Sequence, residues 1–117
     1  MKRKAKKMPD NREKKLLTYV GFAARGRNTA VGTDLALNAV RKAPGKVCVV
    51  SACDASDRTK KQLRDKCLYY KTAHFEPNIT SEELAKTVGK ASVVSAVAVT
   101  DKGLADAIAA LYAETDE

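Results

Sequence analysis

Residues 32–56, GTDLALNAVRKAPGKVCVVSACDAS, predict a helix followed by a buried strand, and this pair sets the class of fold. The helix is expected over residues 33–42, directly after Gly32, with Leu35, Ala39 and Val40 facing inward. Residues 46–52 are almost wholly apolar, which is typical of a strand covered on both faces. A helix that starts at a glycine beside a strand end can present backbone N–H groups and its dipole to a phosphate.

Helices and strands alternate along the rest of the chain. Apolar periodicity, together with residues that end helices and strands, predicts the remaining elements. They are a helix at 11–25, a strand at 28–31, a helix at 57–70, a strand at 72–75, a helix at 81–88, a strand at 93–99 and a last helix around 104–112. Asp54 or Ser56 is expected to cap the helix at 57, and Thr80 with Glu83 forms a T-x-x-E capping box. This alternation predicts an α/β fold with helices on both faces of the sheet.

The length of 117 residues suits one domain, which we place at residues 11–114 after a basic, disordered tail at residues 1–10. Charge is uneven: residues 1–30 hold ten basic and two acidic side chains, whereas residues 75–117 hold three and eight. A basic region of this kind attracts phosphate polymers, although acidic membranes or acidic proteins respond to the same field.

Composition argues against several classes of site. The cysteines at 48, 53 and 67, with the single histidine at 74, lack the C-x2-C pair of a zinc site, so we expect reduced thiols and no metal. No apolar run approaches the ~18 residues of a membrane span, and residues 16–24 predict an amphipathic helix instead of an export signal. We therefore expect a cytoplasmic protein with no membrane partner.

Catalytic motifs are not evident. Gly21 and Gly26 have the spacing of a phosphate-binding loop, but Arg27-Asn28 replaces its Lys and Ser/Thr. One histidine does not support a Ser-His-Asp or Cys-His arrangement. We expect no catalytic residue and no cofactor, hence no enzyme.

A series of short motifs resembles one family in order and spacing. They are Gly32-Thr33-Asp34, Asn38-Ala39-Val40-Arg41, Cys53-Asp54-Ala55-Ser56, Thr59-Lys60-Lys61, Asp65-Lys66-Cys67, Ser81-Glu82-Glu83-Leu84, Val88-Gly89-Lys90 and Val99-Thr100-Asp101-Lys102-Gly103. The family is that of the archaeal and eukaryotic ribosomal proteins that bind kink-turn RNA, most closely its small bacterial members of the YlxQ type. The resemblance extends over about residues 14–108.

This resemblance implies a three-layer α-β-α sandwich with a mixed, mostly buried four-stranded sheet, which binds sharply bent RNA without catalysis. In the family, the start of the second helix enters the RNA groove at tandem sheared G·A pairs, and the loop after the fourth helix covers a base turned out at the kink. The corresponding positions in this chain are Gly32, Thr33, Asp34, Leu35 and Asn38 on the helix, and Ala91, Ser92, Val93 and Val94 in the loop.

The chain departs from the family pattern where bases are read. Asn-Glu is usual at the positions of Asp34 and Leu35, and Lys at the position of Asn38. Leu35 cannot accept a hydrogen bond from a guanine edge, so the resemblance supports RNA binding more strongly than kink-turn specificity. Backbone contacts are expected from four basic residues: Arg25, Arg27, Arg41 and Lys42.

Structured RNA, ribosomal RNA included, is thus the predicted partner of a protein that is expected to act as a monomer, with ribosome-associated proteins as further candidates. One alternative is a protein–protein scaffold, in which the helix at 33–42 and its Leu35 meet a protein. Another is a metal or redox protein built on Cys48, Cys53 and Cys67.

Overall fold

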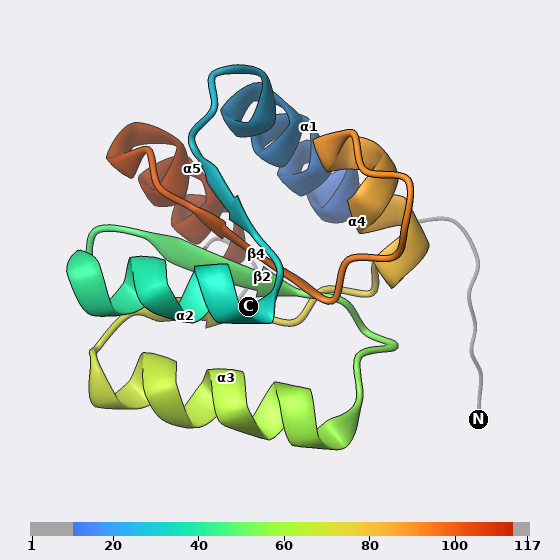
Figure 1. Cartoon of the computed structure of the whole chain (residues 1–117). Coiled ribbons are helices and arrows are strands. Elements are labelled where there is room, and N and C mark those ends of the chain that lie inside the picture. Colours follow the sequence, from blue (N-terminus) through green and yellow to red (C-terminus); the bar gives the residue numbers. More distant parts are fainter. Residues whose placement is uncertain (1–10, 114–117) are drawn as a thin grey trace.

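In the computed structural model, residues 11–113 are described, and they form five helices and one four-stranded sheet (Figure 1). The elements are α1 (Asn11–Arg25), β1 (Thr29–Val31), α2 (Thr33–Lys42), β2 (Cys48–Ser51), α3 (Asp57–Tyr69), β3 (Ala73–Phe75), α4 (Ser81–Val88), β4 (Ala96–Val99) and α5 (Lys102–Ala113). The tail expected at residues 1–10 and the domain end expected at residue 114 lie outside the described residues.

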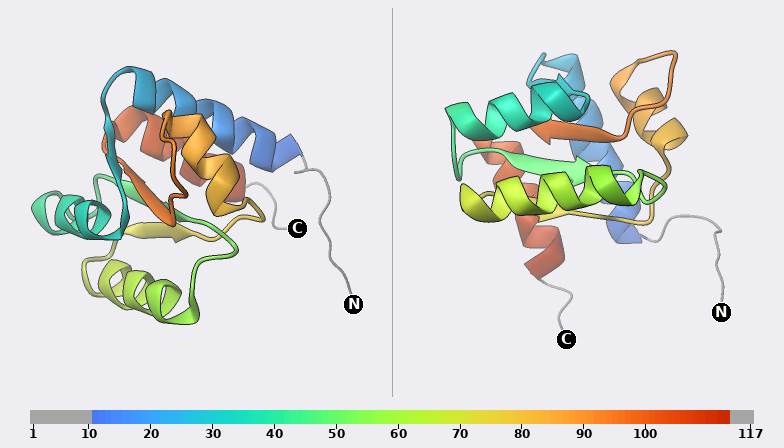
Figure 2. Two further views of the ribbon diagram at one scale, coloured as in Figure 1. Left: turned by 45° about the vertical axis from the view of Figure 1, so that its right-hand side comes forward. Right: turned by 60° about the horizontal axis from the view of Figure 1, so that its bottom comes forward.

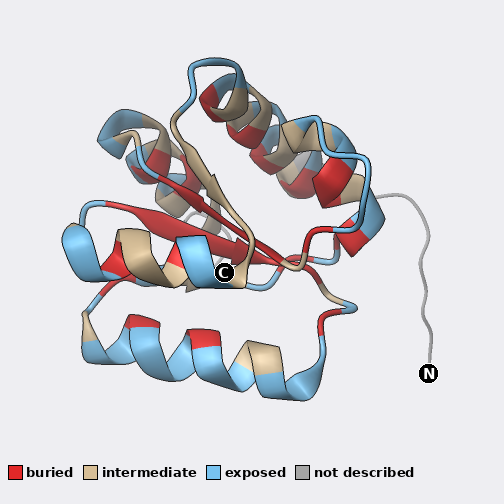
Figure 3. Ribbon diagram, viewed as in Figure 1, coloured by how far each residue is buried: buried red, intermediate tan, exposed pale blue. Residues whose placement is uncertain are grey.

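The sheet is mixed, with the strand order β1-β4-β2-β3. β4 pairs antiparallel with both β1 and β2, whereas β2 and β3 are parallel. Every residue of β2 and β4 is buried, because helices cover both faces of the central pair (Figure 3). The mixed, largely buried sheet expected from the sequence is therefore confirmed.

Side chains of the central strands alternate between two apolar clusters. Val50 and Val97 pack with residues of α1, α4 and α5, while Val49 and Ala98 pack with residues of α2 and α3. The two groups of helices lie on opposite sides of the sheet (Figure 2). This arrangement is the predicted three-layer α-β-α sandwich.

Local helix signals were accurate. α2 spans the expected residues, and the capping box of α4 is formed: the Glu83 N–H donates to Thr80 Oγ1 at 3.1 Å and the Thr80 N–H donates to Glu83 Oε1 at 2.9 Å. Gly89 ends α4 in the left-handed conformation with φ 77°, which a glycine adopts without steric cost.

One of the two proposed caps of α3 is wrong. Ser56 caps this helix by accepting a hydrogen bond from the Thr59 N–H at 3.1 Å. The Asp54 carboxylate instead accepts from the N–H (2.8 Å) and the hydroxyl (3.1 Å) of Ser81, at the start of α4. Because α4 begins beside the end of β2, the contact joins residues that are distant in sequence.

Both apolar strands are shorter than expected. β2 begins at Cys48 instead of residue 46, and β4 begins at Ala96 instead of residue 93. The Val94 N–H donates to the Ser81 carbonyl at 3.2 Å instead of to a strand, so residues before Ala96 form a loop. An apolar run shows burial but not pairing, which is why the strand bounds were too wide.

The expected inward orientation of Leu35 is also wrong. Its side chain is 56% exposed, and the wholly buried residues of α2 are Ala36 and Val40. These two residues are four apart and share the inner face of the helix, whereas Leu35 lies about 100° around the axis from Ala36. Consecutive apolar residues at 35–37 left the helix phase ambiguous.

Candidate functional site

Three helices begin at one edge of the sheet. At its carboxyl end, β1 leads into α2, β2 leads into α3 and β3 leads into α4. Residues 89–95 bring the chain back to the same edge before β4 begins (Figure 1). In open α/β sheets, ligands bind outside the carboxyl ends of the strands, where helix N-termini bring partial positive charge. We therefore take this edge as the candidate site.

The start of α2 differs from the starts of its neighbours. Ser56 caps α3 and Thr80 caps α4, but no side chain caps α2, whose N-cap residue is Gly32. Helix geometry leaves the N–H groups of the first turn without intrahelical acceptors. Those at residues 33–35 are thus the donors that this edge can offer to an anionic ligand.

The loop that precedes β4 is fixed beside this helix start. The Gly32 N–H donates to the Ala96 carbonyl at 2.8 Å, and the Ala52 N–H donates to the Ser95 carbonyl at 2.9 Å. Val94 is buried in the core, so its side chain anchors the loop and is not available to a ligand. Ala91, Ser92 and Val93 are exposed, and Val93 has 67% of its surface accessible.

A hollow of about 200 Å³ lies between this loop and α4. Its lining consists of Glu82, Ala85, Lys86, Lys90, Ala91, Ser92 and Val93. The two lysines were not recognised as site residues from the sequence. Their spacing of four, around the helix-ending Gly89 and next to the predicted loop, was the available signal.

The outer face of α2 carries the remaining predicted contacts. Asp34 and Leu35 are exposed, and Asn38 is half-buried one turn further along. The Arg41 guanidinium donates through Nη2 to Asn38 Oδ1. This hydrogen bond directs the cation back toward the helix start and couples the two side chains.

Arg25, Arg27 and Lys42 lie away from this helix start. Arg25 ends α1 with its guanidinium 5.0 Å from the centre of the Phe22 ring, and Arg27 lies in the turn before β1. Lys42 is at the far end of α2, about 15 Å from its start. The structure therefore places Gly32 beside the start of the strand that follows the 91–94 loop, and leaves these three cations away from that helix start.

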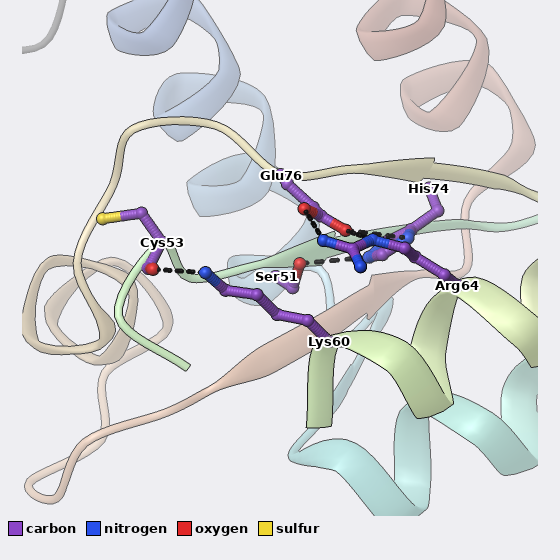
Figure 4. A network of polar contacts seen from close by, with 6 residues as sticks. All are labelled: Ser51, Cys53, Lys60, Arg64, His74 and Glu76. Atoms are coloured by element: carbon purple, nitrogen blue, oxygen red, sulfur yellow. Dashed lines mark hydrogen bonds and ion pairs between the residues drawn. The ribbon is translucent and has the colours of Figure 1, made fainter. Parts of the chain in front are cut away.

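A polar network ties β2 to β3 and α3 (Figure 4). Ser51 Oγ lies 3.0 Å from His74 Nε2, and His74 Nδ1 lies 3.8 Å from Glu76 Oε2. Arg64 donates to both Glu76 oxygens, at 2.7 and 2.9 Å. The order serine, histidine, carboxylate resembles a catalytic triad, but Ser51 is wholly buried, so no substrate can reach its hydroxyl.

The three cysteines are free thiols. Burial raises the pKa of Cys48 to about 12 and that of Cys67 to about 11, and burial with the nearby Asp54 raises the pKa of Cys53. Thiols with raised pKa values stay protonated near neutral pH and are poor nucleophiles and poor metal ligands. Within residues 11–113, no group of three or more His, Cys, Asp or Glu side chains is placed to hold a metal ion.

A helix that spans a membrane is both long and apolar. None between residues 11 and 113 combines the length and the apolar character that crossing a bilayer requires.

Comparison with known proteins identifies relatives over most of the chain. The model of the "Ribosomal protein L7Ae/L30e/S12e/Gadd45 family" matches residues 14–109. The "RNA-binding protein YlxQ" of Bacillus subtilis (strain 168) is 36% identical over 92 residues, which cover 79% of this chain and 89% of that protein. The "RNA-binding protein YlxQ" of Enterococcus faecium is 31% identical over 98 residues, with 84% and 91% covered.

Solved structures agree on the fold. A protein with unknown function from Bacillus halodurans C superimposes with a TM-score of 0.75 at 31% identity, covering 83% of this chain and 95% of its own. The Giardia lamblia 15.5kD RNA binding protein also gives a TM-score of 0.75, at 17% identity and with 93% and 91% covered. At that identity, the second structure supports the fold alone.

Gly32 supplies the first prediction. Its φ of 99° and ψ of 154° fall in a region that is essentially restricted to glycine, although a Cβ would have open space there. We expect Gly32→Ala to lower the free energy of unfolding by about 1–3 kcal/mol, measured by urea denaturation. Gly21→Ala is the matched control: this helical position has ordinary room for a Cβ, so the control is expected to gain about 0.5–1 kcal/mol. Equal effects of the two changes would contradict the backbone explanation.

His74 supplies the second prediction. Burial lowers its pKa, so below about pH 6.5 the folded chain binds fewer protons than the unfolded chain. We expect the free energy of unfolding to fall as pH falls through this value, with a slope of at most about 1.4 kcal/mol per pH unit. His74 is the only histidine of the chain. In His74→Gln, the free energy of unfolding, measured by urea denaturation at several pH values, should therefore no longer show this slope. The Glu76 carboxyl, whose pKa the Arg64 guanidinium lowers, contributes only at more acidic pH.

Proposed function

Because the chain belongs to the ribosomal protein L7Ae/L30e/S12e/Gadd45 family, we propose that it binds structured RNA through the start of α2 and the exposed loop residues 91–93. The observation that carries this proposal is the helix start at Gly32, which has no side-chain cap and is hydrogen-bonded to Ala96, the first residue of the strand that follows that loop. Free N–H groups and the helix dipole suit phosphate or a base edge.

We further propose that the RNA is bent. A bent RNA presents a groove and an unpaired base side by side, which suits the outer face of α2 and the hollow beside α4. Lys86 and Lys90 at the rim of the hollow suit the phosphates that flank such a base. A kink-turn or a similar bend in ribosomal RNA has this shape.

Specificity within this class is expected to differ from that of relatives with Asn-Glu and Lys on the second helix. Asp34 repels phosphate, and Leu35 offers only apolar contact. Asn38 retains a donor and an acceptor, and Arg41 supplies a cation beside it. The shape of the RNA, more than its base edges, is therefore proposed to determine binding.

The proposed role is non-catalytic, and the protein acts as a monomer in the cytoplasm, on ribosomal or another structured RNA. The buried position of Ser51 supports the first point, because it leaves the one triad-like arrangement among residues 11–113 without access.

A titration against a kink-turn RNA and a straight duplex of equal length, at two salt concentrations, tests the function. We expect tighter binding of the bent RNA at both concentrations. Equal affinities with the same steep salt dependence would reduce the protein to a general binder of polyanions.

The third prediction concerns Asn38 and Arg41. We expect Asn38→Ala and Arg41→Ala each to weaken binding of the bent RNA by about 1–3 kcal/mol. Because Arg41 donates to Asn38, the double variant should lose less than the sum of the single losses.

Lys15→Ala, which removes an exposed cation from α1 on the other face of the sheet, is the matched control and should change binding little. If Asn38→Ala and Arg41→Ala weakened the binding of bent RNA and of straight RNA equally, both residues would contact phosphates only.

A protein partner is the second candidate function. The observation in its favour is the exposure of two large apolar side chains near this edge, Leu35 at 56% and Val93 at 67%. Capture from lysate with and without ribonuclease separates the two candidates. A partner that survives ribonuclease and is lost in Leu35→Asn would favour the scaffold.

A further inference from the structure

A second exposed surface lies at the opposite edge of the sheet, where α2 and α3 end side by side (Figures 1 and 2). We call it the distal surface and define it by six exposed residues: Lys42, Lys46, Lys66, Leu68, Tyr69 and Lys71. The proposed RNA site is at the other end of α2, so this surface has no role in that proposal apart from the peripheral Lys42.

Two loops are held together within the distal surface. The Gly45 N–H donates to Thr72 Oγ1 at 2.9 Å, which joins the turn after α2 to the turn after α3. The Lys71 N–H donates to the Leu68 carbonyl at 3.2 Å and closes the end of α3. These bonds keep the lysines of both turns near the exposed end of α3.

The segments that form the distal surface are cationic. Residues 41–47 and 66–72 contain five basic side chains and no Asp or Glu. Three other cations, Lys61, Arg64 and Lys102, form ion pairs with Asp65, Glu76 and Asp106. Within the described part of the chain, none of the four lysines of the distal surface forms such a pair.

An exposed aromatic ring lies among these cations. Tyr69 is 77% exposed and Leu68 is 80% exposed, the largest fractions among the exposed large hydrophobic residues. The Tyr69 ring meets the Tyr70 ring edge-on, with centroids 4.9 Å apart and planes at 86°. Tyr70 packs against the core, so it holds Tyr69 in place while leaving most of that ring accessible.

We propose that the distal surface binds single-stranded RNA, with a base stacked on Tyr69 and phosphates held by the surrounding lysines. Stacking on aromatic rings combined with a cationic track is how proteins bind single strands without reading sequence. A protein partner fits less well, because lysine is depleted in the cores of protein–protein interfaces. This inference is independent of the function proposed for the α2 start.

Fluorescence anisotropy with a labelled oligouridine of about ten nucleotides tests the proposal in the full chain. We expect salt-dependent binding that weakens about tenfold in Tyr69→Ala and less than about twofold in Tyr69→Phe, which keeps the ring. Lys66→Gln should make the affinity for the oligouridine less dependent on salt concentration, because one cation that contacts phosphate is removed. Thermal denaturation confirms that these exposed changes leave the fold intact.

Two comparisons distinguish this inference from the proposed function. Asn38→Ala should bind the oligouridine like the unaltered protein, and Tyr69→Ala should bind a blunt bent RNA like the unaltered protein. Failure of the unaltered protein to bind oligouridine, or equal binding by Tyr69→Ala, would overturn the inference. Tighter, Tyr69-dependent binding of an oligoglutamate peptide would also overturn it and would assign the surface to an acidic protein.

Discussion

The antiparallel pairing of β2 with β4 is the constraint on which the rest of the structure depends. All eight residues of these strands are buried, so their backbone groups must pair with one another and their side chains need cover on both faces. Helices on both sides supply that cover. The same pairing ends at Ser51 and Ala96, which brings the loop before β4 to the edge where α2 begins.

At this edge, side chains of the fold cap the starts of α3 and α4, whereas no side chain caps the start of α2. Ser56 and Thr80 satisfy the starts of α3 and α4, and Asp54 adds a second acceptor to α4. At α2 the N-cap is Gly32, which stabilises no N–H group through a side chain. Sites that bind ligands commonly retain such unsatisfied groups at some cost in stability.

Local signals predicted the fold well because helix starts and stops are determined by neighbouring residues. The Thr80 and Glu83 capping box and the terminal Gly89 gave α4 its bounds. The apolar run at 93–99 was less informative, since burial of Val94 in a loop and burial of Val97 in a strand look alike in sequence. Only the partners of the backbone N–H groups separate the two cases.

Periodicity, caps and the order of motifs were enough to predict the succession of helices and strands, the sandwich and the family, because these are local or collinear properties of the chain. Tertiary structure decided which residues meet. It placed Asp54 at the start of α4, linked Ser51 to His74, exposed Leu35, and set Lys86 and Lys90 at a hollow. These outcomes depend on strand pairing and helix phase, which bring together residues that no local pattern relates.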